Sequence, residues 1–332
     1  MACGARGIPP NAPLAPVGKA NYMYCLANKE SDRSGRGNRF PREDDMSKAL
    51  RIFQGSFGRV ALLDMDGALI HHAHPHCHVL IKASGADTFF AVRDRLHPLR
   101  DDTAVLVNTW EPHSYAHQPG APATTILALY IEPRWLADMQ RDFTACANPG
   151  FFPQSCGDLT PHIRRLADRM ANELLFTDEA GERHEQALMD LMVALIDRFS
   201  EWRSLRGAVF AARLPASDYR VRNAVRYMRA TLGEEFNADK VAQAAGLSRA
   251  HLFRLFHSTL QITPALYFNV LRMEAAIGAL ADGAESVTTL SDRLGFAAPS
   301  HFTRFFRNNQ GVTPTEYRRV VNLVDRAAPG AA

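Results

Sequence analysis

Histidine is unusually dense in one short stretch of this 332-residue chain, where residues 71–78 read HHAHPHCH. Side chains two residues apart on an extended strand share a face, and imidazole nitrogens are ligands that zinc, iron, nickel and copper accept in proteins. We therefore expect one strand to direct alternate histidines into a pocket, joined by a later histidine. The candidate effector or metal ligands are His72, His74, His76, His78 and His113.

Two interpretations of these histidines stay open. In one they hold a divalent metal, and in the other they are polar groups lining a pocket for an organic effector. No cofactor is certain, and a divalent metal is the one candidate. We assign no catalytic residue, because Cys77 fits a small buried strand residue better than a nucleophile.

A second constellation lies near the C-terminus, where one helix-loop-helix pattern occurs twice at an offset of 50 residues. Apolar residues spaced i, i+3, i+4 predict a buried stripe on each helix, and each Thr-Pro pair fits the N-cap and first position of the next helix. Gly246 and Gly295 mark the turn before each helix, as in a helix-turn-helix unit. The repeated positions are Leu252, Arg254, Phe256, Thr263 and Pro264, matched by Phe302, Arg304, Phe306, Thr313 and Pro314.

In such a unit the second helix enters the DNA major groove, so its outward face carries the candidate contacts. Arg254 and Arg304 are placed to reach guanine edges or phosphates, and Ala250 and Phe253 to touch thymine methyl groups. A salt bridge within the protein is the alternative for Arg254. The candidate DNA-binding residues are Arg249, Ala250, His251, Phe253, Arg254, Pro299, Ser300, His301, Thr303 and Arg304.

The repeat resembles the DNA-binding domain of the AraC-type (arabinose-regulator-like) transcription factors. Gln261 stands where a glycine is usual and predicts a different turn geometry in the first unit, and Ser291 replaces a usual alanine. The histidine region is similar to the cupin barrel that many of these regulators use as a sensor, although His78 stands where cupin enzymes usually have glutamate. The matching residues are Ser248, Leu252, Arg254, Phe256, Thr263, Pro264, Tyr267, Leu271, Arg272, Ala276, Leu280, Leu290, Gly295, Phe296, Ser300, Phe302, Arg304, Phe305, Phe306, Gly311, Thr313, Pro314, Tyr317 and Arg318.

The resemblance implies a ligand-responsive, sequence-specific transcription regulator, more often an activator than a repressor, and not an enzyme. Its implied partners are double-stranded promoter DNA, a small-molecule effector, a second copy of the chain and, for an activator, RNA polymerase. The alternative from another class is a cupin metalloenzyme with an appended DNA-binding domain. The effector, the operator and the oligomeric state are not readable from the sequence.

The fold class that we expect is a multi-domain α+β chain: an antiparallel, cupin-like β-barrel, a helical segment, and an all-α domain with two helix-turn-helix units. Five short β-type runs predict strands at Val60–Met65, His78–Lys82, Thr88–Val92, Thr103–Val107 and Thr124–Ile131. Helices in the segment that follows either pair two subunits or cap the barrel. The expected parts are a disordered or mis-annotated extension at 1–45, an effector domain at 46–132, the helical segment at 133–205, a linker at 206–217 and the DNA-binding domain at 218–325.

Composition narrows the class further. The formal net charge of +3 fits a groove reader better than an indiscriminate phosphate binder. The five cysteines lack CxxC spacing, and no apolar run reaches membrane-spanning length. We therefore expect a reduced, cytoplasmic protein with no membrane partner.

Overall fold

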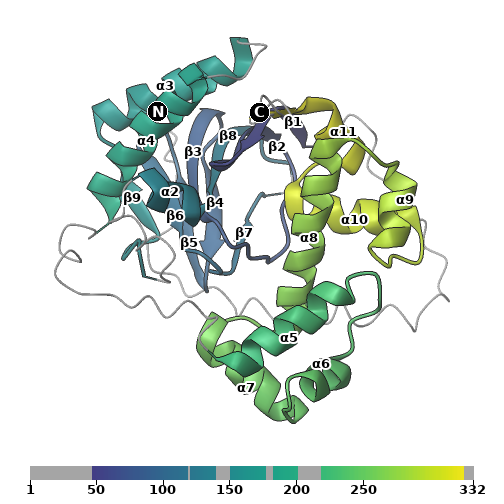
Figure 1. Cartoon of the computed structure of the whole chain (residues 1–332). Helices are drawn as coiled ribbons and strands as arrows, with labels where there is room; N and C mark the ends of the chain where they lie inside the picture. Colours follow the sequence, from purple (N-terminus) through teal and green to yellow (C-terminus); the bar gives the residue numbers. More distant parts are fainter. Residues whose placement is uncertain (1–46, 119, 140–149, 177–181, 201–217, 325–332) are drawn as a thin grey trace, which may run out of the picture. The chain divides into compact units, whose positions relative to one another are not determined.

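The computed structural model describes residues 47–118, 120–139, 150–176, 182–200 and 218–324, and all of them belong to the compact unit Glu43–Ala332. The expected N-terminal extension at 1–45 and linker at 206–217 lie outside the described residues. Among the described residues, no helix has both the length and the apolar character needed to span a membrane. A β-rich N-terminal domain precedes a helical C-terminal domain, as the sequence predicts (Figure 1).

The N-terminal domain contains two sheets whose described pairings are antiparallel, except that β10 joins β1 in parallel. The five expected strands are confirmed as β2, β3, β4, β6 and β8. The larger sheet has the order β10 (Val321–Leu323), β1 (Lys48–Gly55), β2 (Gly58–Met65), β8 (Thr124–Ile131), β3 (Cys77–Gly85), β6 (Thr103–Val107) and β9 (Cys156–Asp158). The smaller sheet has the order β5 (Arg95–Leu99), β4 (Thr88–Val92) and β7 (His113–Tyr115).

Both faces of the larger sheet are buried, and each packs against a different layer. Along β3, Val79 joins the core under the helices, whereas Leu80 joins the core shared with the smaller sheet. On β8, Leu129 and Ala128 divide in the same way. This follows from the two-residue alternation of a strand. The interior between the sheets is where alternate side chains from β3 and β8 meet.

Helices α3 (Pro161–Phe176) and α4 (Glu182–Phe199) lie over the larger sheet, and α2 (Pro133–Met139) follows β8 (Figure 1). Thr160 caps α3, because its Oγ accepts from the Ile163 amide at 3.2 Å. The apolar stripes of α3 and α4 are buried in one core with strands β1, β3 and β8. Both helices therefore pack on the larger sheet, and pairing with a second chain stays a prediction.

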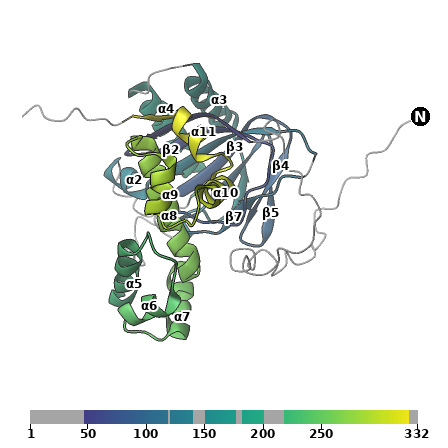
Figure 2. The same ribbon diagram turned by 90° about the vertical axis from the view of Figure 1, so that its right-hand side faces the viewer.

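The C-terminal domain contains two helix-turn-helix units joined by the long helix α8 (Figure 2). Thr263 and Thr313 cap the helices that follow them, each accepting a backbone amide at 3.2 Å, as the Thr-Pro pairs predict. At 19 residues, α8 is about 28 Å long. The helices are α5 (Tyr219–Ala230), α6 (Ala238–Ala244), α7 (Arg249–Leu260), α8 (Pro264–Asp282), α9 (Val287–Arg293), α10 (Pro299–Gln310) and α11 (Pro314–Val320).

The turn after α7 corrects one expectation. Gln261 adopts φ 59° and ψ 13°, the left-handed conformation that Gly311 adopts at the equivalent place with φ 79°. The predicted difference in turn geometry between the two units was therefore wrong. The Gln261 amide closes α7 by donating to the His257 carbonyl at 3.0 Å, and this helix-ending hydrogen bond offsets the strain of a side chain at positive φ.

The chain returns to the N-terminal domain after α11. There β10 pairs with β1, and the Tyr317 hydroxyl donates to Gln54 Oε1 at 3.0 Å. The buried Arg59 guanidinium lies 4.0 Å from the ring centre of Tyr130 and 5.9 Å from that of Tyr317. A cation held between aromatic rings is a favourable contact, so this arginine contributes to joining β2, β8 and α11.

Candidate nucleic-acid interface and histidine cluster

The first helix-turn-helix unit turns its apolar stripe inward. Leu252 and Phe256 on α7 are fully buried, and the Ser248 side chain caps the helix by accepting from the His251 amide at 3.3 Å. This leaves a polar outer face at the start of the helix. Of the predicted contacts, Arg249, Ala250 and Arg254 are exposed, and His251 and Phe253 are half-buried.

The second unit repeats this arrangement on α10. Phe302 and Phe306 are fully buried, and the N-cap position holds Ala298, which has no side-chain cap. Pro at the first helical position supplies a preformed start in place of the cap. Of the predicted contacts here, Pro299, Ser300, His301 and Arg304 are exposed, and Thr303 is half-buried.

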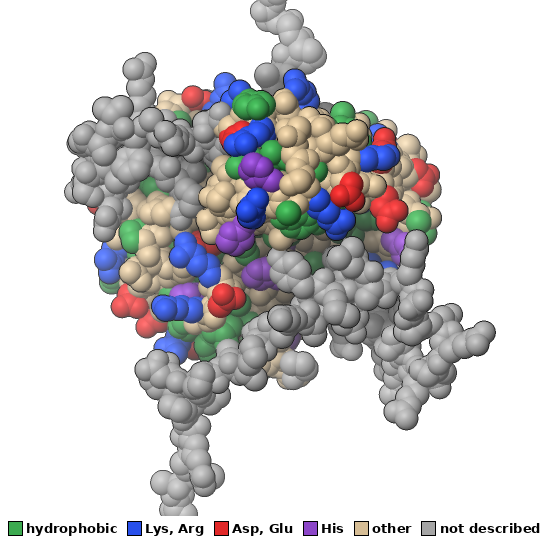
Figure 3. Space-filling view, turned by 90° about the horizontal axis from the view of Figure 1, so that it is seen from below, with side chains coloured by type: hydrophobic (Ala, Val, Ile, Leu, Met, Phe, Trp, Pro, Cys, Tyr) green, Lys and Arg blue, Asp and Glu red, His purple; other side chains and the backbone are tan. Residues whose placement is uncertain are grey.

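The arginines on these faces are available to an anionic partner. Arg249 forms an ion pair with Asp239 at 3.3 Å, but both side chains are more than 60% exposed, so this pair is weak and exchangeable. Within the described part of the chain, Arg254 and Arg304 form no ion pair, so the salt-bridge alternative for Arg254 finds no partner there. Figure 3 shows basic and histidine side chains among hydrophobic ones, with acidic side chains mainly toward the sides.

Sequence reasoning assigned no role to Arg272, which holds α8 in place between the two units. Its guanidinium lies 4.7 Å from the ring centre of Phe268 and 5.1 Å from that of Phe296, and it donates to the Leu232 carbonyl at 3.0 Å. Burial lowers the pKa of Arg272 from its ordinary value. Arg272 is one of the residues that match the AraC-type pattern, and that match was the one sign in the sequence that it has a role.

The histidines of the N-terminal domain gather, although not by the predicted route. Strand β3 begins only at Cys77, because Pro75 precedes it and cannot donate to a ladder, so a single strand carrying four alternating histidines was wrong. His72 instead pairs with His113 in an antiparallel bridge, with both backbone hydrogen bonds at 2.9 Å.

Four of the five predicted histidines come together. The ring centres of His72 and His113 are 4.3 Å apart, those of His74 and His113 4.9 Å, and those of His74 and His78 4.8 Å. His76 turns away, with ring nitrogens 3.7 Å from a carboxylate oxygen of Glu132 and 4.0 Å from one of Glu274. We call His72, His74, His78 and His113 the histidine cluster.

Backbone carbonyls determine the tautomer of three of these rings. The Nδ1 atoms of His72, His78 and His113 lie 2.8, 2.9 and 2.9 Å from the carbonyls of Ile70, Leu129 and Glu111. A carbonyl only accepts, so each Nδ1 carries the proton and each Nε2 presents a lone pair. Within the described part of the chain, neither ring nitrogen of His74 has a hydrogen-bond partner, and Nε2 of His113 has none.

The cluster is uncharged at neutral pH. Burial lowers the pKa of His72 to about 4 and that of His78 to about 3. Burial also lowers the pKa of His74 and of His113 well below the ordinary value, and the neighbouring imidazoles add to the effect. Neutral imidazole is the form that binds a metal ion.

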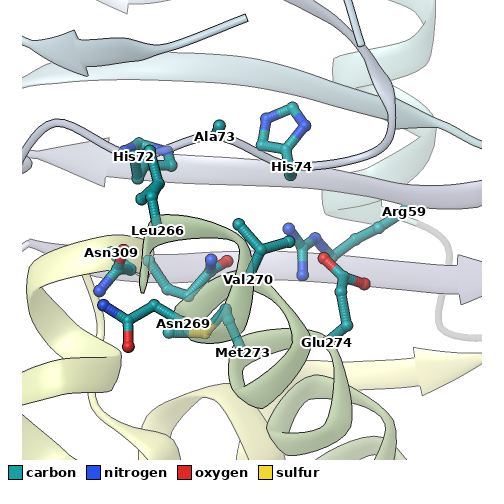
Figure 4. Close-up of a pocket in the computed structure, with 11 residues that line it drawn as sticks. Arg59, His72, Ala73, His74, Leu266, Asn269, Val270, Met273, Glu274 and Asn309 are labelled. Carbon is teal, nitrogen blue, oxygen red and sulfur yellow. The ribbon is translucent and has the colours of Figure 1, made fainter. Parts of the chain in front are cut away.

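Two small cavities adjoin the cluster. One lies between the sheets, with a volume of about 10 Å³, and His72, His78, His113, Phe90 and Tyr130 are among its lining residues. The other, of about 20 Å³, lies between the loop carrying His72 and His74 and helix α8 (Figure 4). Each has room for roughly one water molecule, so the described conformation has no space for a large organic effector at these two places.

Comparisons with known proteins agree with this division of the chain. Residues 64–196 match the profile of an AraC-like ligand binding domain, and residues 241–320 match that of a helix-turn-helix domain. ArgR from Pseudomonas aeruginosa, a helix-turn-helix transcriptional regulator, is 30% identical over 40% of this chain and 46% of its own length. RhaS from Escherichia fergusonii, a transcriptional activator, is 23% identical over 76% of this chain and 89% of its own length.

Solved structures support the fold. An apo ToxT variant from Vibrio cholerae has a TM-score of 0.51 at 12% identity, covering 80% of this chain and 98% of the other. ToxT bound to an unsaturated fatty acid has a TM-score of 0.50 at 11% identity, covering 83% of this chain and 94% of the other. The chain spans about half the length of ArgR, so that relative supports its domains more than a whole activity. With a ligand-binding domain and a tandem helix-turn-helix domain of this type in one chain, the protein belongs to the AraC-type family of transcription regulators.

Proposed function

We infer that this chain is a sequence-specific DNA-binding transcription regulator that responds to a ligand in its N-terminal domain. The observation that carries the inference is the pair of helices α7 and α10, each with a buried apolar face and an exposed polar face. Helix α8 separates them by about 28 Å of helix, which suits two neighbouring major grooves on one side of a duplex. Operator half-elements about 10 base pairs apart are the expected target.

The finer features of the function extend the family assignment. We infer activation of transcription, with RNA polymerase as the partner at the promoter, and a homodimer as the working form. RhaS, which matches this chain over most of its length, is itself named an activator. The bound unsaturated fatty acid in the ToxT structure is a ligand of ToxT, and it does not identify the ligand of this chain. A cytoplasmic location follows from the proposed DNA target.

The test is a gel-shift titration of the full chain on the promoter region beside its own gene. Each arginine that pairs with a guanine edge contributes about 1–3 kcal/mol, so Arg254→Ala and Arg304→Ala should each weaken specific binding by about 5- to 150-fold. Arg169→Ala is the matched control, because Arg169 lies on α3, not on α7 or α10, and pairs with Asp190 at 3.8 Å. Its affinity should equal that of the wild type.

Melting temperatures of all three variants separate lost contacts from lost folding. Both Arg254 and Arg304 are exposed, so their replacement should leave stability within about 0.5 kcal/mol. Wild-type protein that shifts specific and scrambled DNA equally at moderate salt would refute the proposed function. Equal losses in the Arg169→Ala control would refute the assignment of the reading residues.

A further inference from the structure

The histidine cluster supplies none of the predicted DNA contacts, and hydrogen bonds among the described residues do not account for it. His74 is 6% exposed and His113 is 1% exposed, yet three ring nitrogens of these two residues have no hydrogen-bond partner among the residues that the structure describes. A buried polar atom without a partner costs free energy, so such atoms call for an explanation by a missing ligand or by function. One of the two His74 nitrogens carries the ring proton, so His74 and His113 offer one unpartnered lone pair each, and together these point to a bound species that accepts lone pairs.

The arrangement of protons selects the kind of ligand. The Nδ1 hydrogens of His72 and His113 are engaged by the Ile70 and Glu111 carbonyls, which leaves Nε2 of each ring as a lone-pair donor. A histidine that donates its other N–H to a carbonyl is the usual form of a metal ligand, because that bond holds the ring orientation and raises its basicity. His74 keeps both nitrogens open and completes a group of three.

The distances between the ring nitrogens agree with a metal site whose ligands have not yet closed around an ion. One ring nitrogen from each of His72, His74 and His113 lies within 4.8 Å of the others, and all three residues are buried. Tetrahedral zinc with bonds of about 2.0–2.1 Å holds its ligand nitrogens about 3.4 Å apart, so small side-chain rotations close the set. His78, whose Nδ1 is held by the Leu129 carbonyl, lies beside the three as a fourth imidazole.

We propose that His72, His74 and His113 form a binding site for a divalent first-row transition metal, with zinc as the reference ion and the His78 imidazole beside it. An all-imidazole set suits zinc, copper, nickel and iron and disfavours calcium and magnesium, which take oxygen ligands. The adjoining cavity of about 10 Å³ fits an ion with a water molecule better than an organic effector. This role rests on the proposed function, in which the metal is all or part of the ligand of the N-terminal domain. Metal binding itself needs no DNA.

Zinc retention by the full chain tests the site. Purified protein is stripped with a chelator, desalted, mixed with two equivalents of Zn²⁺, desalted again and measured by elemental analysis. We expect one zinc per wild-type chain. His74→Leu and His113→Asn should each weaken zinc binding at least tenfold, in line with the effect of removing ligands or their partners. His97→Gln is the matched control, because His97 lies half-buried on β5 outside the cluster and should not change retention.

Cysteine binding and misfolding are excluded by two further measurements. Every variant keeps all five cysteines, and Co²⁺ substituted into the wild type should give visible absorption of nitrogen-bound cobalt without the ultraviolet charge-transfer band of thiolate ligation. Circular dichroism verifies folding of each variant. Absence of retained zinc in the wild type, retention by His74→Leu and His113→Asn equal to the wild type, or a thiolate band would each overturn the proposal.

Gel shifts with stripped and zinc-loaded protein keep this proposal distinct from the proposed function. Protein that retains zinc but binds no specific DNA would refute the regulator and support the metal site. Protein that binds its operator but retains no zinc would support the regulator and refute the metal site.

Discussion

Replacing His74 with leucine should make the metal-free protein more stable. The His74 side chain is buried, and no described residue forms a hydrogen bond with either of its ring nitrogens. Leaving a buried polar group without a partner costs about 1–3 kcal/mol, and leucine fills a similar volume with apolar atoms. The His74 carbonyl accepts from the Trp110 amide at 2.8 Å, and this backbone bond survives the substitution.

Zinc should reverse this order of stability. A ligand that binds the folded state at 100 times its Kd adds about 2.7 kcal/mol to the free energy of unfolding. The wild type should receive this gain, whereas His74→Leu should receive little, since one of its three ligands is missing. At roughly 2–4 °C per kcal/mol, the variant should melt about 2–12 °C above the wild type in chelator, and that advantage should vanish or reverse in zinc.

The assay is thermal melting of the wild type, His74→Leu and the control His97→Gln, each with chelator and with excess Zn²⁺. His97→Gln should follow the wild type in both conditions. A variant that melts below the wild type in chelator would refute the argument from unpartnered nitrogens, because His74 would then be contributing favourable contacts. An equal rise with zinc in the wild type and in His74→Leu would refute the role of His74 as a ligand.

Four changes in the C-terminal domain, measured by urea denaturation, test its local strain, a buried hydroxyl and a helix cap. Gln261→Gly should raise the free energy of unfolding by about 1 kcal/mol by relieving a side chain at φ 59°, and Gly311→Ala should lower it, because φ is 79° there and the added Cβ would lie 2.8 Å from Met65 Cε. Ser291→Ala should raise it by about 1 kcal/mol, since the Ser291 hydroxyl is fully buried and has no hydrogen-bond partner in the described ranges. Thr313→Ala should lower it by about 1 kcal/mol by removing a capping box. A shift of opposite sign in any variant would contradict the stated cause for that residue.

The helical repeat was predictable because its signals are local. The Thr263 and Thr313 caps depend on neighbours three residues away, and the burial of Leu252 and Phe302 follows from helical spacing alone. The turn at Gln261 was not predictable in this way. Whether a residue adopts positive φ depends on the balance between its backbone strain and the hydrogen bond that the turn forms. The sequence does not show which of the two is larger.

The sequence predicted all four members of the histidine cluster, and it also predicted His76, which turns away from them. His76 differs from His74 by its neighbours Glu132 and Glu274, which come from distant parts of the chain. The expectation of one continuous strand failed at Pro75, which a strand interior disfavours. The carbonyls that set the tautomers belong to Ile70, Glu111 and Leu129, and backbone partners of this kind leave no mark in the sequence.

Ile70 connects the histidine cluster to the second reading helix. Its carbonyl accepts from His72 Nδ1 at 2.8 Å, and its amide donates to the Asn308 carbonyl near the end of α10 at 3.1 Å. A ligand that rotates His72 therefore acts on a residue hydrogen-bonded to the helix that carries Arg304. Coupling between two sites is typically about 1–3 kcal/mol, or 5- to 150-fold, and reciprocal. We expect zinc to change the Kd for operator DNA by a factor in this range, and operator DNA to change the Kd for zinc by the same factor; identical Kd values with and without the other ligand would show that this connection transmits nothing.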